Sequence, residues 1–176
     1  MPDISGHDVR IERPAARAMV SLKVAKAAAD QAARRLQLAA PLRVSDTEPQ
    51  SLWLAPDHWL LASRVQSAET LVARCTEELA GILHLAADYS AALASRRLAG
   101  PGARRLLASG SGLDFRATGF PAGTCCRTRF AQVAAVITAA GENEFEIFVD
   151  RSYEGYLSDW LSDSMDIAAR AAAGQG

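Results

Sequence analysis

The sequence predicts an α+β fold built from two ferredoxin-like-type units, each a sheet covered on one face by helices. Three observations lead to this prediction. The chain has 176 residues, 49% of them hydrophobic, which is enough for a sizeable buried core. Residues 19–89 read in the order strand, helix, strand, strand, helix, strand, which is the split βαβ pattern. Residues 91–161 then begin a second alternation of strands and helices that does not repeat the first in sequence.

The predicted boundaries follow from composition. Residues 1–16 are polar with mixed charge and predict a flexible arm. Residues 17–164 form the α+β domain, with halves at about 17–90 and 91–164. Residues 165–176 fade into an Ala/Gly-rich flexible tail. No Pro/Gly-rich linker separates the halves, so we expect one compact body rather than two separate domains.

The elements of the first half have local causes. Ser67 is a suitable N-cap, and Leu71, Cys75 and Leu79 recur every four residues behind it, which predicts an amphipathic helix. The dipeptide Pro56-Asp57 separates two apolar aromatic runs and predicts a hairpin. The expected elements are a strand at 19–24, a helix at 26–38, hairpin strands at 52–54 and 59–62, the helix after Ser67, and a strand at 84–89.

The second half is read in the same way. Gly100-Pro101-Gly102 turns the chain, and proline suits the start of a helix. Residues 144–149 alternate and predict a strand, with Phe145, Ile147 and Val149 on one side and Glu144, Glu146 and Phe148 on the other. The expected elements are a strand at 91–98, a helix at 103–108, a loop at 111–123, strands at 125–132 and 133–140 (continuous or broken by a tight turn), a strand at 144–149, and a final helix capped by Ser152 whose apolar stripe is Tyr153, Tyr156, Leu157, Trp160 and Leu161.

Charge and composition exclude several classes of protein. The net charge of −1 gives no electrostatic case for binding nucleic acid or an anionic membrane surface. No apolar run approaches the roughly 20 residues of a membrane span, and the N-terminus does not resemble a signal peptide. Three cysteines without CxxC spacing are typical of reduced thiols, so we expect a cytoplasmic location.

Motifs for nucleotide or metal chemistry are absent from the sequence. It contains no P-loop, no HExxH and no GxSxG pattern. The three histidines, His7, His58 and His84, are not spaced as metal ligands, and we interpret them as surface or core-edge residues. Cys125 and Cys126 lie beside arginines that could lower a thiol pKa, but no base is near them in sequence, so we expect at least one to be packed in the core.

Arg116, Arg127 and Arg129 are the strongest candidates for contacts with a partner or a ligand. Three guanidinium groups could bind a carboxylate or a phosphate. The alternative, which we favour, is that Arg127 and Arg129 pair with Glu144 and Glu146 across neighbouring strands.

Carboxylates and tryptophans supply the remaining candidates. Asp57, Asp88 and Asp150 each follow or end a strand and are either general bases or, more commonly, turn caps. Trp53 and Trp59 are either core residues or anchors for a partner, because tryptophan is enriched at interface hot spots. No catalytic, cofactor-binding or metal-binding residue is predicted, which favours a subunit or binding module over a stand-alone enzyme.

Several motifs, in order along the chain, resemble a known family. They are Leu52-Trp53-Leu54-Ala55-Pro56-Asp57-His58-Trp59-Leu60-Leu61, Ala87-Asp88-Tyr89-Ser90, Leu98-Ala99-Gly100-Pro101-Gly102-Ala103-Arg104, Phe120-Pro121-Ala122-Gly123-Thr124-Cys125-Cys126-Arg127-Thr128-Arg129-Phe130 and Phe145-Glu146-Ile147-Phe148-Val149-Asp150-Arg151-Ser152-Tyr153. Together they resemble the gamma subunit of heterotetrameric sarcosine oxidase, within the aminomethyltransferase (glycine-cleavage T-protein) fold, of which this chain would match the N-terminal part. The resemblance covers most of the chain from about Trp53 to Leu161.

The resemblance implies a place in a four-subunit flavoenzyme of one-carbon metabolism. Such an enzyme oxidatively demethylates sarcosine and yields glycine, hydrogen peroxide and a one-carbon unit, either folate-bound or released as formaldehyde. By the same resemblance, FAD, FMN, NAD and tetrahydrofolate are expected in the partner alpha and beta subunits and zinc in the delta subunit. The gamma chain would be a non-catalytic assembly subunit without a cofactor of its own.

Two other functions stay open at this point. The first is a stand-alone folate-binding protein related to the aminomethyltransferases, which would need a carboxylate such as Asp57, Asp88 or Asp150 in a folate-sized cavity. The second is a small-ligand regulatory module in which Arg116, Arg127 and Arg129 grip the ligand.

Overall fold

The computed structural model describes residues 4–6 and 8–173, and it is an α+β fold with two antiparallel sheets and four α-helices among these residues. The chain divides into two compact units. Unit 2 comprises residues 15–92, and unit 1 comprises residues 1–14 together with 93–176. The boundary near residue 92 agrees with the predicted division between the halves. The predicted packing of the halves into one body stays a prediction.

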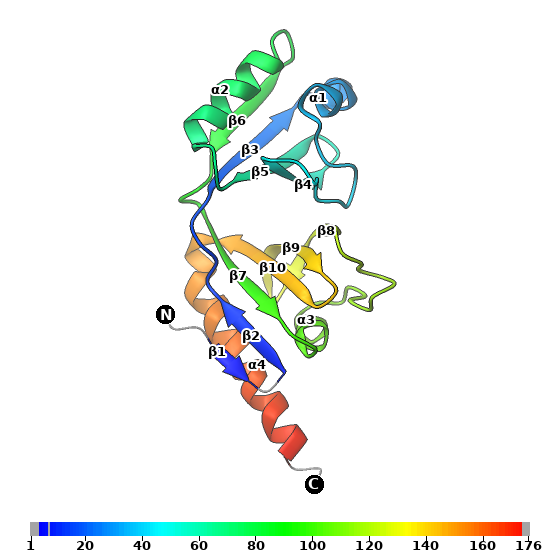
Figure 1. Ribbon diagram of the computed structural model, residues 1–176, viewed down its shortest axis with the longest axis vertical. Helices are drawn as coiled ribbons and strands as arrows, with labels where there is room; N and C mark the ends of the chain where they lie inside the picture. The colour runs from blue at the N-terminus through cyan, green and yellow to red at the C-terminus, as the bar shows by residue number, and fades with distance from the viewer. Residues whose placement is uncertain (1–3, 7, 174–176) are drawn as a thin grey trace. The chain divides into compact units, whose positions relative to one another are not determined.

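Unit 2 has the predicted split βαβ topology. Its sheet has the strand order β4-β5-β3-β6, with every neighbouring pair antiparallel. Its elements are β3 (Ala18–Val24), η1 (Lys26–Ala28), α1 (Ala29–Leu36), β4 (Gln50–Ala55), β5 (His58–Ser63), α2 (Ala68–Glu78) and β6 (His84–Asp88). Figure 1 shows β6 at one edge of this sheet with α2 beside it. The predicted strands, hairpin and helices of the first half are therefore confirmed.

The core of unit 2 lies between the two helices and one face of the sheet. Leu71, Cys75 and Leu79 are buried at the four-residue spacing read from the sequence. They pack with Leu22 and Trp59, whose strands β3 and β5 place them opposite each other. The predicted N-cap of α2 is also present, because the Ser67 side chain accepts a hydrogen bond from the backbone N–H of Thr70.

Unit 1 has a six-stranded sheet with the order β1-β2-β7-β10-β9-β8. Its elements are β1 (Ile4–Gly6), β2 (Val9–Glu12), β7 (Leu93–Ala99), α3 (Ala103–Gly110), β8 (Cys125–Phe130), β9 (Val133–Gly141), β10 (Glu144–Asp150), η2 (Arg151–Tyr153) and α4 (Glu154–Ala173). The strands β8, β9 and β10 form a meander, so this sheet follows a different order from that of unit 2. The strands predicted at 125–132 and 133–140 are separated by a tight turn at Ala131 and Gln132, both of which have positive φ.

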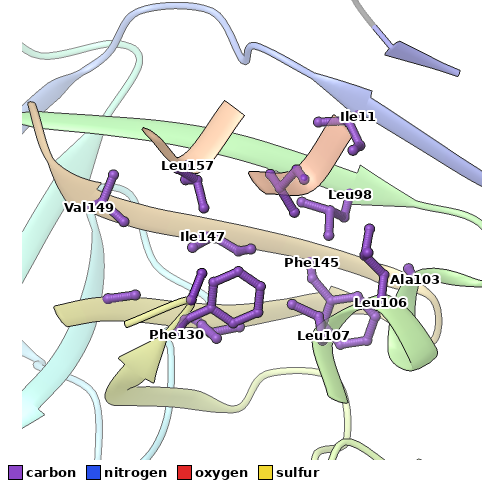
Figure 2. Packing of buried hydrophobic residues seen from close by; sticks show 14 of the residues in the cluster. Ile11, Leu98, Ala103, Leu106, Leu107, Phe130, Phe145, Ile147, Val149 and Leu157 are labelled. Carbon is purple, nitrogen blue, oxygen red and sulfur yellow. The ribbon is translucent and has the colours of Figure 1, made fainter. Parts of the chain in front are cut away.

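The core of unit 1 lies under α3 and α4. Figure 2 shows Leu157 of α4 and Leu106 and Leu107 of α3 packing toward Phe145 and Ile147 of β10. Phe145, Ile147 and Val149 are all buried on one face, as their alternation predicts.

Two predictions for the chain ends need correction. Residues 1–16 are not a loose arm throughout, because Val9 and Ile11 are buried and β2 pairs with β7, with Ile11 opposite Leu98. The alternation of Val9 and Ile11 is short and lies among charged residues, so the composition of this region did not predict a strand. Helix α4 runs through residues 165–173 of the predicted tail, and residues 174–176 lie outside the described part of the chain.

The start of α4 also differs from the prediction. Asp150, not Ser152, supplies the capping oxygen, and the one turn of η2 precedes the α-helix. The predicted stripe is narrower than expected, because Leu157 is buried while Tyr153 and Tyr156 are more than 40% exposed.

Candidate functional site

The guanidinium group of Arg116 is paired with a neighbouring carboxylate. Its Nε and Nη2 atoms donate to the two carboxylate oxygens of Asp114 at 2.8 and 2.7 Å, and its backbone N–H donates to the same group at 3.0 Å. These hydrogen bonds from Arg116 lower the pKa of Asp114 to about 2. The pair closes a turn in the loop before β8, so Arg116 reaches a ligand only by giving up this carboxylate.

Arg127 and Arg129 are exposed on one face of β8. The predicted pairing with Glu144 and Glu146 is wrong, because β9 lies between β8 and β10 in the sheet. Glu144 instead accepts a 2.6 Å hydrogen bond from Arg97 of β7, the strand on the other side of β10. The Nε of Arg129 donates to the backbone carbonyl of Gln132 at 3.2 Å. Strand alternation alone does not identify the neighbouring strand, which is why the sequence misassigned these pairs.

The adjacent cysteines are not arranged as a nucleophile. Cys125 is fully buried, and desolvation is the main reason that its pKa rises to about 12. Cys126, which lies on the opposite face of the strand, is half-buried, and burial raises its pKa as well. Both thiols therefore stay protonated near neutral pH, as expected for packed residues.

The three candidate aspartates do not form a catalytic group. Asp88 accepts a hydrogen bond from the backbone N–H of Ser90 at 2.8 Å. Asp150 accepts from the N–H and hydroxyl of Ser152 at 3.0 and 2.7 Å. These serine hydrogen bonds lower the pKa of both carboxylates, which are solvent-exposed turn caps. Asp57 lies in the β4–β5 turn, where its backbone carbonyl accepts from the N–H of Val24.

Two histidines form hydrogen bonds with a serine hydroxyl and a backbone carbonyl. The Nε2 of His58 and the Oγ of Ser21 form a 2.8 Å hydrogen bond, and the Nδ1 of His84 lies 2.8 Å from the carbonyl oxygen of Ile82. His7 lies outside the described residues. Within the described part of the chain, no three His, Cys, Asp or Glu side chains are grouped as metal ligands.

The two candidate tryptophans have different positions. Trp59 is only 3% exposed, and its indole N–H donates to the carbonyl of Ala39 at 3.0 Å, which makes it a core residue rather than an exposed partner contact. Trp53 is half-buried and packs against the same core cluster. Beside this cluster lies a cavity of about 10 Å³, lined by Leu36, Leu38, Pro49, Ser51, Leu61, Leu71, Arg74 and Cys75, which is room for roughly one water molecule.

Arg104 is an organising residue of unit 1 that the sequence did not single out. Its guanidinium donates to the backbone carbonyls of Phe115 at 2.6 Å and Phe120 at 3.1 Å, and also to that of Glu142. The same group lies 5.0 Å from the ring centre of Phe145. One side chain thus fastens the long loop before β8 to the β9–β10 turn. The sequence feature that could have identified Arg104 is its position at the end of the Gly-Pro-Gly-Ala-Arg motif.

The glycines of that motif also have a structural reason. Gly100 has φ of +123°, and a Cβ at this position would lie 2.5 Å from the carbonyl oxygen of Asp8. The N–H of Gly102 donates to that same oxygen at 2.9 Å. The turn is therefore shaped to receive the start of β2.

The sequence matches the family model described as "Sarcosine oxidase, gamma subunit family" over residues 20–167. This chain belongs to the sarcosine oxidase gamma subunit family. The match spans most of the chain and confirms the resemblance found in the motifs. No curated protein gives a significant match.

Two solved structures share the fold of this gamma-family chain. One is the heterotetrameric sarcosine oxidase from Corynebacterium sp. U-96 in complex with pyrrole 2-carboxylate, with a TM-score of 0.80 and 24% identity over 93% of this chain and 87% of that chain. The other is the glycine cleavage system aminomethyltransferase T from Bartonella henselae, with a TM-score of 0.63 and 18% identity over 90% of this chain. This chain spans 46% of the aminomethyltransferase.

The gamma-family chain exposes large apolar side chains at the β6 edge of unit 2. Leu83 is 81% exposed and Leu85 is 66% exposed. Val65, before α2, is comparably exposed at 82%. Leu83 and Leu85 are two residues apart on one strand segment, whereas Val65 lies by itself before α2. Within residues 4–6 and 8–173, no helix has the length and apolar character to cross a bilayer.

Proposed function

We propose that this chain is a non-catalytic gamma subunit of a heterotetrameric sarcosine oxidase-like flavoenzyme, in which it acts in assembly and docks on the large subunits. The observation that carries the proposal is the gamma-family match over residues 20–167. The fold shared with the Corynebacterium enzyme, which is itself heterotetrameric, supports it.

The chemistry of the candidate residues supports a non-catalytic role. The cysteine thiols are protonated, Asp88 and Asp150 cap turns, and Arg116 is held by Asp114. The cavity of about 10 Å³ is far smaller than the roughly 300 Å³ or more of an ordinary small-molecule site. We therefore assign FAD, FMN, NAD and tetrahydrofolate to the alpha and beta partner subunits and zinc to the delta subunit.

The reaction proposed for the whole assembly is the oxidative demethylation of sarcosine. Two electrons leave the N-methyl amine and reduce oxygen to hydrogen peroxide, and water hydrolyses the resulting imine to glycine and formaldehyde. Where tetrahydrofolate is bound, it takes up the one-carbon unit in place of its release as formaldehyde. In this proposal the gamma chain contributes no reacting atom, and its location is the cytoplasm.

The test is co-expression of a tagged form of this chain with the alpha, beta and delta chains, followed by the absorbance and size of what co-purifies. The proposal predicts a flavin-coloured complex that oxidises sarcosine. A colourless tagged chain that binds tetrahydrofolate in a calorimeter would instead support the stand-alone folate-binding function, which the shared aminomethyltransferase fold brings into consideration.

A further inference from the structure

We propose that the free edge of strand β6 is the surface through which this chain binds a large partner subunit, and that an extended segment with alternate apolar side chains and acidic residues adds to it as a further strand. The proposal rests on the proposed function as a subunit, and it names the docking face that this function requires.

The backbone of β6 has one unpaired side. In the sheet of unit 2, β6 is an edge strand whose neighbour is β3. The N–H of Ala25 donates to the carbonyl of Leu83 at 2.9 Å, and the N–H of Tyr89 donates to the carbonyl of Met19 at 2.7 Å. In an antiparallel ladder these bonds alternate along the strand. Odd-numbered residues of β6 therefore bond to β3.

It follows that His84, Ala86 and Asp88 direct their backbone N–H and C=O groups away from β3, toward the open edge. This leaves three alternate positions where an added strand can exchange main-chain hydrogen bonds. Such strand addition obtains affinity from the backbone and specificity from alternate side chains.

The side chains beside this edge are unusual for an unprotected strand. Charged residues, proline and bulges protect many edge strands from strand addition, and within β6 the one aspartate, Asp88, stands at the end of the strand. Leu83 and Leu85 are both large, apolar and exposed. They lie two residues apart, so their side chains are on the same face of the strand segment. Exposed apolar side chains beside an unpaired strand edge are typical of a surface that another segment covers.

Charge identifies the kind of segment that fits. The sequence has two lysines, and both lie near β6 rather than on it, Lys23 in the neighbouring strand β3 and Lys26 in η1. Lys23 is the register partner of Leu85 across the β3–β6 ladder, and Lys26 follows in η1 immediately after the residue that bonds to Leu83. Both lysines are exposed, and neither forms an ion pair with another described residue. Two unpaired ammonium groups near Leu83 and Leu85, at the end of β6 opposite Asp88, favour a partner segment that carries carboxylates next to apolar residues at that end.

The experiment uses the co-expressed complex with its large subunits. Leu85→Asp and the double variant Lys23→Glu/Lys26→Glu are compared with matched controls at the opposite end of α2, Val65→Asp and Arg64→Glu. The β6-edge variants are expected to weaken assembly by about tenfold or more, the effect of losing an interface anchor, whereas the controls leave it unchanged. Equal assembly of all variants with the wild type overturns the proposal.

A second arm tests the backbone directly and does not depend on any substitution. Amide hydrogen exchange of His84, Ala86 and Asp88 is measured in the isolated chain and in the complex. Strand addition predicts at least about tenfold slower exchange at these three amides on assembly, because each gains a hydrogen-bond acceptor. Unchanged exchange in an intact complex refutes the strand addition and leaves the subunit function standing. Failure of the wild-type chain to assemble refutes the proposed function and the docking face together.

Discussion

Replacing Arg104 tests how one side chain organises unit 1. Arg104→Met keeps the apolar stem of the side chain and removes the guanidinium. The variant loses hydrogen bonds to the carbonyls of Phe115 and Phe120, both partly buried, and a third to Glu142 at the surface. It also loses the contact of the cation with the ring of Phe145.

The magnitude follows from these contacts. The two partly buried hydrogen bonds contribute about 1 kcal/mol each, or somewhat more because the donor is charged. The surface bond adds little, and the cation–π contact adds about 0.5–1 kcal/mol. We therefore expect Arg104→Met to lower the free energy of unfolding by about 2–4 kcal/mol, a large share of the stability of an ordinary domain.

The matched control is Arg105→Met on the same helix. The Arg105 side chain is 73% exposed and makes one ion pair with Asp8 at 3.2 Å. Such surface pairs contribute about 1 kcal/mol or less, so this variant should lose at most that. Arg104→Lys should recover only part of the loss, because one ammonium group lacks the planar fork that reaches several carbonyls at once.

The assay is chemical denaturation combined with hydrogen exchange, which separates the two units. The midpoint of unfolding of unit 1 should fall in Arg104→Met, while exchange in unit 2 stays as in the wild type. Equal midpoints for Arg104→Met and Arg105→Met would refute the organising role of Arg104.

Three further predictions concern other sites. Gly100→Ala should destabilise the protein by about 2 kcal/mol or more through its positive φ and the clash at the turn, whereas Gly155→Ala, with open space around its Cβ, should be neutral or stabilising in a thermal melt. Arg116→Ala should raise the pKa of Asp114 from about 2 toward 3.8 in an NMR titration, and an unchanged pKa would contradict the role of Arg116. Because the pKa of Asp114 is depressed in the folded state, the stabilisation by this pair is present above pH 4 and is lost as the pH falls toward 2. Cys126, half-buried with a raised pKa, should react with a thiol reagent at pH 7.5 at least about tenfold more slowly than in the unfolded chain, and equal rates would contradict its burial.

Local sequence signals predicted the helices and strands, but they did not predict which strands pair when those strands are far apart in the sequence. The Ser67 cap and the alternation of Phe145, Ile147 and Val149 are written within a few residues, and the structure confirms them. The pairing of Ile11 with Leu98 joins residues far apart in the sequence, so the local composition of residues 1–16 does not indicate it.

The same limit explains the candidate site. The arginines of β8 and the glutamates of β10 were predicted to pair because their charges are opposite. The order of the strands in the sheet decides which residues meet, and it places Arg97 rather than Arg127 beside Glu144. Arg104 was overlooked because its partners are backbone carbonyls, which leave no side-chain signature in a sequence. The exposure of Leu83 and Leu85 depends on which edge β6 occupies, which the alternation of one strand does not specify.

The most direct test of the subunit role is the native mass of the flavin-containing complex purified through a tag on this chain. The subunit role predicts a coloured assembly in which this 18.7 kDa chain accompanies the alpha, beta and delta chains, with flavin released from the large chains on denaturation. A colourless 18.7 kDa monomer from the same co-expression, with an active flavoenzyme formed by the other chains alone, would contradict the subunit role.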